Sequence, residues 1–233
     1  MLLSFQLHVA HVAHVAHAAT ALQADLSQLV IAGWAGRDAA AIEHHIEELA
    51  AIGVPRPSSV PLYYRVAANQ LTQHEVVQVV GPHSSGEVEA FVFSVDGSLY
   101  VSIASDHTDR KLEAHSVALS KQICVKPVAR DAWRFDDVAA HWDQLHVRAW
   151  IEEGGAEVLY QDGTLASLRS ANELISGYTA GQSMPDAAGM TCGTVAVIGG
   201  IRPAPVFRME LHDPVLNRRI NHRYAVDVLP EVA

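Results

Sequence analysis

The feature that most restricts the fold is a short strand that carries two glutamates among apolar residues. In residues 86–93, Gly-Glu-Val-Glu-Ala-Phe-Val-Phe, side chains alternate between two faces, so Glu87 and Glu89 lie on one face together with two phenylalanines. Both faces are apolar apart from two carboxylates whose Cα atoms lie about 7 Å apart. Like charges near a core repel each other and lose hydration, and a divalent cation held by oxygen ligands relieves both effects. For this motif alone, a solvent-exposed strand start is the alternative.

A predicted hairpin places a third carboxylate beside this pair. The turn at residues 95–98, Val-Asp-Gly-Ser, is typical of a β-hairpin because Asp-Gly adopts positive φ easily, and the next strand is expected at Leu99–Ala104. Paired residue numbers in this hairpin sum to about 193, so Asp106 faces Glu87. Directly opposed like charges destabilise a sheet, so this arrangement favours a bound cation. We therefore expect oxygen atoms of the three carboxylates within about 5 Å of a common point.

The rest of the pattern predicts many strands and few helices. Further strands are expected at 28–34, 62–66, 76–80, 147–152, 194–198, 206–211 and 220–228, with a hairpin turn at 161–163, and helices at 39–52, 109–120, 136–145 and 167–180. There is no strand–helix–strand alternation, so the fold class is α+β. No linker is evident, which predicts a single domain over residues 1–233, with an N-terminal strand or hairpin at 1–27.

The N-terminal segment contains a repeat of three residues that places histidines at His8, His11, His14 and His17. A metal-binding tract, used by a zinc-dependent hydrolase, is one interpretation. However, a spacing of three drifts around a helix and alternates faces along a strand, so the imidazoles do not converge easily. The favoured interpretation is a duplication that lengthens an edge hairpin or a surface turn.

The predicted helix at 39–52 carries a candidate acid–base pair. At about 100° per residue, His45 falls within the apolar stripe and Glu48 on its flank, whereas His44 and Glu47 point away. A histidine oriented by a carboxylate is typical of a general base. The alternative is a histidine that seals the helix edge beside a solvated glutamate. The sequence lacks His-Glu-x-x-His, which argues against a zinc protease.

Composition disfavours several classes of partner. The 233 residues carry a formal charge of −10 without any run of Lys or Arg, so the clustered cations that bind nucleic-acid phosphates are missing. No apolar run approaches the roughly 20 residues that span a bilayer. Cys124 and Cys192 are far apart in the sequence, which fits a reducing compartment. The first residues lack a basic signal-peptide region, so we expect a cytoplasmic protein with no nucleic-acid or membrane partner.

A series of motifs resembles the fumarylacetoacetate-hydrolase-like superfamily, in the order in which that family has them, over about residues 30 to 230. They are His45-x-x-Glu48, Pro61-Leu62-Tyr63-Tyr64-Arg65, Glu87-x-Glu89, Ser105-Asp106-His107-Thr108, Ser120-Lys121-Gln122 and Gly193-Thr194-Val195. The chain looks most similar to a short bacterial branch of that superfamily. The resemblance implies a mixed β-roll of the fumarylacetoacetate-hydrolase type at residues 28–233, usually a homodimer.

The resemblance also implies an activity. Such enzymes bind Mg²⁺ or Mn²⁺, here through Glu87, Glu89 and Asp106, and act on a small 2-oxo or β-diketo acid through a metal-stabilised enolate. The reaction would be a C–C hydrolysis or a related decarboxylation, hydration or isomerisation. The residues implied as catalytic are His45, Glu48 and Lys121, and those implied as substrate-binding are Lys121, Thr194, Arg65 and His107. A non-catalytic relative that keeps the fold and binds a metal or an anion is the alternative.

The chain departs from the family pattern at several positions. Only 17 positions separate Glu89 from Asp106, and His107, Asp109, Val195 and Arg65 replace residues that are usual in the family. Lys121 nevertheless stands between apolar stretches, so its ammonium is expected to be partly desolvated and to need an anionic partner. We expect that ammonium within about 8 Å of the carboxylate cluster.

Overall fold

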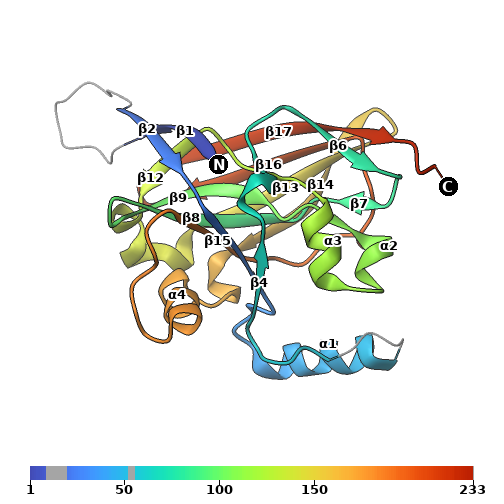
Figure 1. Ribbon diagram of the computed structural model, residues 1–233, viewed down its shortest axis with the longest axis horizontal. Coiled ribbons are helices and arrows are strands. Elements are labelled where there is room, and N and C mark those ends of the chain that lie inside the picture. Colours follow the sequence, from blue (N-terminus) through green and yellow to red (C-terminus); the bar gives the residue numbers. More distant parts are fainter. Residues whose placement is uncertain (9–19, 52–55, 233) are drawn as a thin grey trace.

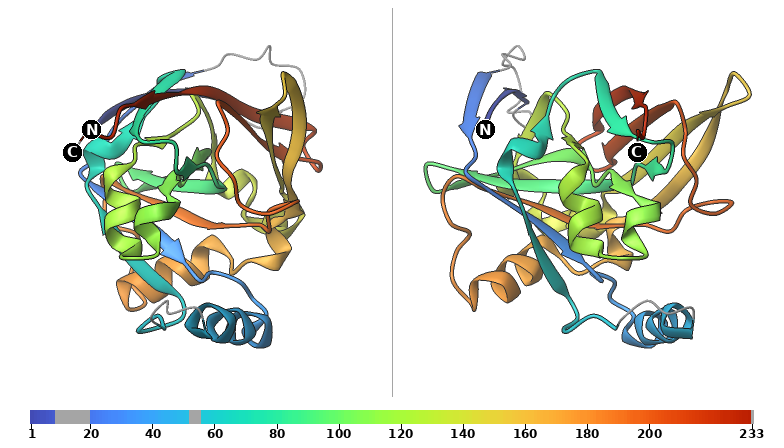
Figure 2. Two further views of the ribbon diagram at one scale, coloured as in Figure 1. Left: turned by 90° about the vertical axis from the view of Figure 1, so that its right-hand side faces the viewer. Right: turned by 45° about the vertical axis from the view of Figure 1, so that its right-hand side comes forward.

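The computed structural model describes residues 1–8, 20–51 and 56–232, and it shows two curled β-sheets that enclose the main core (Figures 1 and 2). In the described residues, the larger sheet has the order β2 (Thr20–Asp25), β1 (Leu2–Leu7), β12 (Asp131–Arg134), β9 (Ser98–Ser105), β8 (Val88–Val95), β15 (Ala188–Thr194), β3 (Gln28–Gly33) and β4 (Leu62–Val66). The smaller sheet has the order β14 (Ala156–Thr164), β13 (His146–Glu153), β16 (Val206–Asp213), β17 (Arg218–Leu229) and β6 (Val76–Val80). Both sheets mix parallel and antiparallel pairs, which confirms the predicted α+β class and the mixed β-roll.

Short elements complete the fold. They are the strand pairs β5 (Leu71–Thr72) with β11 (Lys126–Pro127) and β7 (Ser84–Ser85) with β10 (Thr108–Asp109), and the helices α1 (Ala39–Ala51), α2 (Arg110–Glu113), α3 (Val117–Ile123) and α4 (Ala171–Thr179). Helices α2 and α3 lie side by side, and α1 lies at one end of the molecule, beyond β4 (Figures 1 and 2). No helix in the described part of the chain is long and apolar enough to cross a membrane.

Strand β8 is buried on both faces, as its apolar pattern predicts. Val88 and Val92 belong to the core between the two sheets. Phe91 and Phe93 belong to a second cluster beneath the N-terminal hairpin of β1 and β2, where the rings of Phe5 and Phe93 stack with centroids 4.5 Å apart. The face that carries Glu89 therefore ends in an aromatic cluster, and the carboxylate lies at its edge.

The β8/β9 hairpin has the predicted register. Val88 pairs with Ser105, and the N–H of Asp106 donates to the carbonyl of Glu87 at 2.9 Å. The turn between the strands has φ 52° at Asp96 and φ 73° at Gly97, a conformation that Asp-Gly supplies with little strain. Because the turn fixes the register, the two acidic residues meet across the ladder.

Two of the expected helices are wrong in form. The segment at 109–120 is broken into α2 and α3, because Asp109 caps the first helix and Ser116 starts a new one by accepting from the N–H of Leu119. The segment at 136–145 consists of 3-10 turns at Phe135–Asp137 and Ala139–Gln144. The helix expected at 167–180 begins later, at Ala171, after a capping box formed by Ser170 and Glu173.

Two strand assignments also need correction. The β13/β14 turn lies at Gly154-Gly155, where φ is 59° and 80°, and not at 161–163, which belongs to β14. The Gly-Gly pair supplies two successive positive φ angles. A strand is expected at 194–198, but in the structure strand β15 ends at Thr194. Beyond that strand, Val197 forms an isolated bridge to Gln161.

The N-terminus forms a hairpin in the described residues, with Leu2 opposite Asp25 and Leu7 opposite Thr20. Most of the histidine repeat, including His11, His14 and His17, lies outside the described residues. Its role as a lengthened hairpin turn or as a metal-binding tract stays a prediction.

Candidate active site

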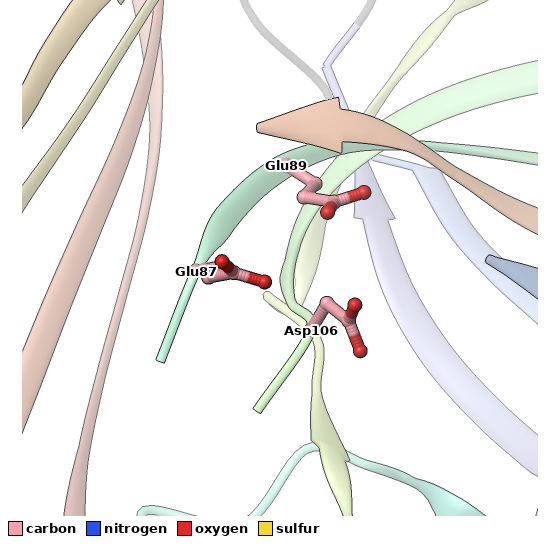
Figure 3. Close-up of side chains that lie close together, drawn as sticks. All are labelled: Glu87, Glu89 and Asp106. Atoms are coloured by element: carbon pink, nitrogen blue, oxygen red, sulfur yellow. The ribbon is translucent and has the colours of Figure 1, made fainter. Parts of the chain in front are cut away.

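Three carboxylates meet where the β8/β9 hairpin opens. Glu89 lies on β8, Glu87 directly precedes that strand, and Asp106 directly follows β9. One oxygen atom of each residue lies within 4.8 Å of the others, and Figure 3 shows the three side chains around one common space. Glu89 and Asp106 are buried and Glu87 is half-buried. Converging carboxylate oxygens are the ligands that Mg²⁺ and Mn²⁺ prefer, so these residues could hold such an ion.

The surroundings of Glu89 oppose its negative charge. Burial, together with the charges of Asp106 and Glu87, raises the pKa of Glu89 to about 8. The N–H of Gly193, at the end of β15, donates to Oε2 of Glu89 at 2.8 Å and fixes the carboxylate. A cation at the common point would favour the ionised form. A buried acid with such a raised pKa, beside two other carboxylates, is typical of a functional site.

Two lysines contact Asp106, one at each oxygen. The ammonium of Lys121, on α3, donates to Oδ2, and the ammonium of Lys126, on β11, lies 3.0 Å from Oδ1. Burial acts to raise the pKa of Asp106, but the charges of the two lysines outweigh it, and the pKa falls well below its usual range. Burial likewise acts to lower the pKa of Lys121, but Asp106 and Glu87 hold it above its ordinary value. Asp106 is thus an ionised ligand candidate.

Arg110 supplies a third cation. Its guanidinium forms an ion pair with Oε1 of Glu87 at 3.2 Å, donates to Oγ of Ser85 at 2.7 Å and pairs with Glu113 at 2.9 Å. Arg110 begins α2, directly after the Asp109 cap. Three cations therefore surround the three carboxylates, and each touches a candidate metal ligand from the side of α2, α3 or β11.

Thr194 lies beside the cluster, opposite Glu89 in the β15/β8 ladder. Its hydroxyl donates to the carbonyl of Val88 at 2.8 Å and accepts from Nε2 of Gln161 at 2.7 Å. The structure therefore brings Lys121 and Thr194 to the carboxylates, as the family motifs suggest. Their roles toward a substrate stay predictions.

Arg65 is not brought to the carboxylates. It is exposed, and its guanidinium donates to the hydroxyl of Tyr178 on α4 at 3.0 Å. Tyr63 packs against the same helix, whereas Tyr64 faces the other way, with its ring centroid 5.8 Å from Nζ of Lys121. Alternation along β4 explains the difference, because odd-numbered residues face α4 and Tyr64 faces the site. The substrate-binding assignment of Arg65 is therefore not supported.

His107 is a packed structural residue. It is 1% exposed; Nδ1 lies 2.9 Å from the hydroxyl of Tyr224, and Nε2 lies 2.9 Å from Oγ of Ser84. Burial lowers the pKa of His107 to about 3, so the ring is neutral. Both ring nitrogens already have partners inside the fold, which favours a structural role, and the assignment of His107 to substrate binding stays a prediction.

His45 and Glu48 lie on α1, which extends over Ala39–Ala51 as the sequence predicts. Their side chains are outside the described part of the chain. His44, its neighbour, is exposed. The acid–base assignment of His45 and Glu48 stays a prediction.

Sequence reasoning missed Lys126, Arg110 and Tyr64 as parts of this site. Lys126 stands in an apolar stretch, Cys-Val-Lys-Pro-Val, and a lone cation in such a stretch is the signal that indicated Lys121. Arg110 directly follows the acidic cap of a short helix and gave no comparable signal. Tyr64 could not be assigned to the site from the sequence, because the sequence does not show which face of β4 is turned toward the cluster.

Comparison with solved structures shows which proteins share this fold. The chain is similar to a 2-keto-3-deoxy-D-arabinonate dehydratase complexed with magnesium and 2,5-dioxopentanoate, at 14% identity and a TM-score of 0.65, over 89% of this chain and 75% of that one. It is similar to yeast ynq8, a fumarylacetoacetate hydrolase family protein, at 13% identity and a TM-score of 0.61, over 89% and 96%. It is also similar to Cg1458, at 16% identity and a TM-score of 0.62, over 89% and 77%. The fold is that of the fumarylacetoacetate-hydrolase-like superfamily.

Sequence comparison defines the family more narrowly. A family model described as a protein of unknown function, DUF2848, matches residues 32–224, and the chain belongs to this family. No curated protein sequence matches the chain. The matched region begins on β3 and ends on β17, so it includes the carboxylate cluster and the cations around it.

Proposed function

We propose that this protein is a divalent-metal-dependent hydrolase or lyase that acts on a small 2-oxo or β-diketo acid. The observation that carries the proposal is the convergence of Glu87, Glu89 and Asp106 within 4.8 Å, with Lys121 on one of these ligands. The dehydratase of similar fold, whose structure contains magnesium and 2,5-dioxopentanoate, supports this class of ligand. The expected ion is Mg²⁺ or Mn²⁺.

The three carboxylates would hold the ion, and their oxygens match its ligand preference. When bound, the ion supplies positive charge that withdraws electrons from a substrate carbonyl and favours the enolate. Lys121 would hold the anionic end of the substrate, because its ammonium lies at the cluster and donates charge-assisted hydrogen bonds. Tyr64 would form a wall beside that ammonium.

His45 and Glu48 would move the proton or activate water, as a histidine oriented by a carboxylate does in general acid–base catalysis. Thr194 would assist in binding the anionic end from the β15 side. The reaction would be a C–C hydrolysis, a decarboxylation, a hydration or an isomerisation. A single domain, a homodimer and a cytoplasmic location are part of the same proposal.

An activity screen tests the proposal. Purified protein with Mg²⁺ or Mn²⁺ is incubated with a panel of 2-oxo and β-diketo acids, and substrate loss is followed by absorbance and by mass spectrometry. We expect turnover of at least one compound that is lost on metal chelation and in Glu87→Gln. Metal binding with oxalate binding but without any turnover would instead assign the protein to non-catalytic relatives that bind an anion. Zinc in the purified protein, retained by Glu87→Gln, would point to the histidine repeat.

A further inference from the structure

Lys126 is the feature of this site that the proposed function leaves without a role. Its side chain is 0% exposed, compared with 8% for Lys121, and it contacts the same carboxylate. An ammonium in such a place loses its hydration completely, and a buried ion pair rarely gains enough to stabilise a fold better than an apolar pair would. The burial of Lys126 therefore indicates a role beyond packing.

The two lysines reach Asp106 from different settings. Lys126 is opposite Leu71 in the β11/β5 ladder. Just beyond it, the N–H of Val128 donates to the carbonyl of Thr72, and the N–H of Ala129 donates to the carbonyl of Ile103. The ammonium of Lys126 also donates to the carbonyl of His107. Backbone pairing on both sides fixes the backbone of Lys126 beside Asp106, and its ammonium lies 3.0 Å from Oδ1.

Lys121 has a different position. It lies on the short helix α3, where Leu119 and Ile123 are 51% exposed, so one side of that helix faces solvent. Its ammonium contacts Oδ2 and lies 5.8 Å from the centroid of the Tyr64 ring. Oδ1 of Asp106 thus forms an ion pair, without a hydrogen bond, with a lysine held on a paired strand, whereas Oδ2 accepts from a lysine on a short surface helix.

We infer that Lys126 is a positioning residue: it fixes Asp106 through Oδ1, so that Oδ2 is presented to the metal and Lys121 is released toward the substrate. The inference rests on the proposed function. It predicts that Asp106 binds the ion through Oδ2 while Oδ1 remains on Lys126. It also assigns opposite effects on metal affinity to two lysines that touch one carboxylate.

The sign of these effects makes the inference testable. Simple electrostatics predicts that removal of either ammonium tightens cation binding, because a nearby positive charge is lost. If Lys126 positions Asp106, its removal should instead weaken cation binding. The loss of a residue that orients a metal ligand typically lowers metal affinity by about 10- to 100-fold. A merely structural lysine would lower the melting temperature and leave the Mn²⁺ dissociation constant unchanged.

The experiment titrates wild type, Lys126→Met and Lys121→Met with Mn²⁺, and free Mn²⁺ is measured by electron paramagnetic resonance. We expect Lys126→Met to weaken Mn²⁺ binding by about 10-fold or more and Lys121→Met to tighten it. Unchanged or tighter binding by a folded Lys126→Met would overturn the inference while leaving the proposed function intact. Wild type that binds no Mn²⁺ would instead contradict the proposed function itself.

A second measurement uses the wild-type chain, so that it does not depend on whether Lys126→Met folds. A crystal structure with Mn²⁺ should show Oδ2 of Asp106 on the metal, Oδ1 still on Lys126, and the ammonium of Lys121 moved from Asp106. A metal bound through Oδ1, or Lys126 detached from Asp106, would refute the positioning role.

Discussion

The ammonium of Lys121 donates to Oδ2 of Asp106, although the two residues are 15 positions apart in the chain. Between them the chain leaves the β8/β9 hairpin, forms α2 and α3, and returns to the same carboxylate. The other oxygen of Asp106, Oδ1, is buried, lies 3.0 Å from the ammonium of Lys126 and has no hydrogen-bond partner. A metal ion at this carboxylate would share it with Lys121, so metal affinity should depend on the position of that ammonium.

Added Mg²⁺ or Mn²⁺ should raise the melting temperature, because an ion that binds only the folded state stabilises it. At about 100 times the dissociation constant the gain is about 2.7 kcal/mol, which corresponds to roughly 5 to 10 °C for a chain of this size. Glu87→Gln should remove most of the shift, as measured by differential scanning calorimetry. Glu231→Gln, an exposed control that changes the same charge, should keep it. An undiminished shift in Glu87→Gln would make the metal assignment wrong.

Without metal, stability should fall as the pH rises from about 6.5 to 8, because below about 6.5 the lowered pKa of His107 contributes a slope of opposite sign. The pKa of Glu89 is raised from 4.5 to about 8, so in this range the folded state binds more protons than the unfolded state, and stability decreases by up to about 1.4 kcal/mol per pH unit. Urea unfolding with a chelator measures the slope, and Glu89→Gln should flatten it. The metal-induced shift should grow over the same range, because the ion needs ionised Glu89. A slope that survives in Glu89→Gln would place the titrating group elsewhere.

His45→Ala should lower turnover of any substrate found by about 100-fold or more, the usual contribution of a general acid or base. His44→Ala is the matched control, since it removes a neighbouring imidazole that is exposed and lies on another side of the helix. Steady-state kinetics of both variants is the measurement. Equal losses in the two variants would contradict the assignment of His45 from helical periodicity.

Lys121→Met should weaken binding of oxalate, a planar mimic of an enolate, by about 10- to 100-fold in the presence of Mg²⁺, because hydrogen bonds to a charged group contribute about 1.5 to 3 kcal/mol. Lys111→Met removes an exposed ammonium that pairs with Glu231 and should leave oxalate affinity unchanged. Isothermal titration calorimetry compares the two variants. Equal oxalate affinity in Lys121→Met and wild type would leave the anchoring role without support.

Tyr224→Phe should lower the free energy of unfolding by about 1 to 3 kcal/mol, because it leaves buried polar groups of His107 and Ser105 without their partner. Tyr178→Phe, which loses a bond to exposed Arg65, should change it by less than about 0.5 kcal/mol. Oxalate affinity should remain as in wild type, since His107 is structural. A change in oxalate affinity without loss of stability would support His107 as a substrate-binding residue.

Local chemistry in the sequence was sufficient for the hairpin and for the carboxylate cluster. Alternation along Val88–Val95 assigned the two faces of that strand, and the Asp96-Gly97 turn fixed the register that joins Asp106 to Glu87. Side-chain period and turn geometry are both properties of a few neighbouring residues. The same reasoning failed at 109–120, where a second cap at Ser116 competed with helical periodicity.

Tertiary structure decided which other side chains reach the cluster. The alternation of side chains along β4 predicts that Tyr64 and Arg65 lie on opposite faces. Only the packing of α4 against β4 determines which of them faces Lys121. Likewise, the ring of His107 is held inside the fold by Tyr224, which is 117 positions away. The side on which a residue is buried depends on partners that are distant in the chain. The sequence alone therefore determined the carboxylates and their spacing, and the fold selected the cations and aromatic residues around them.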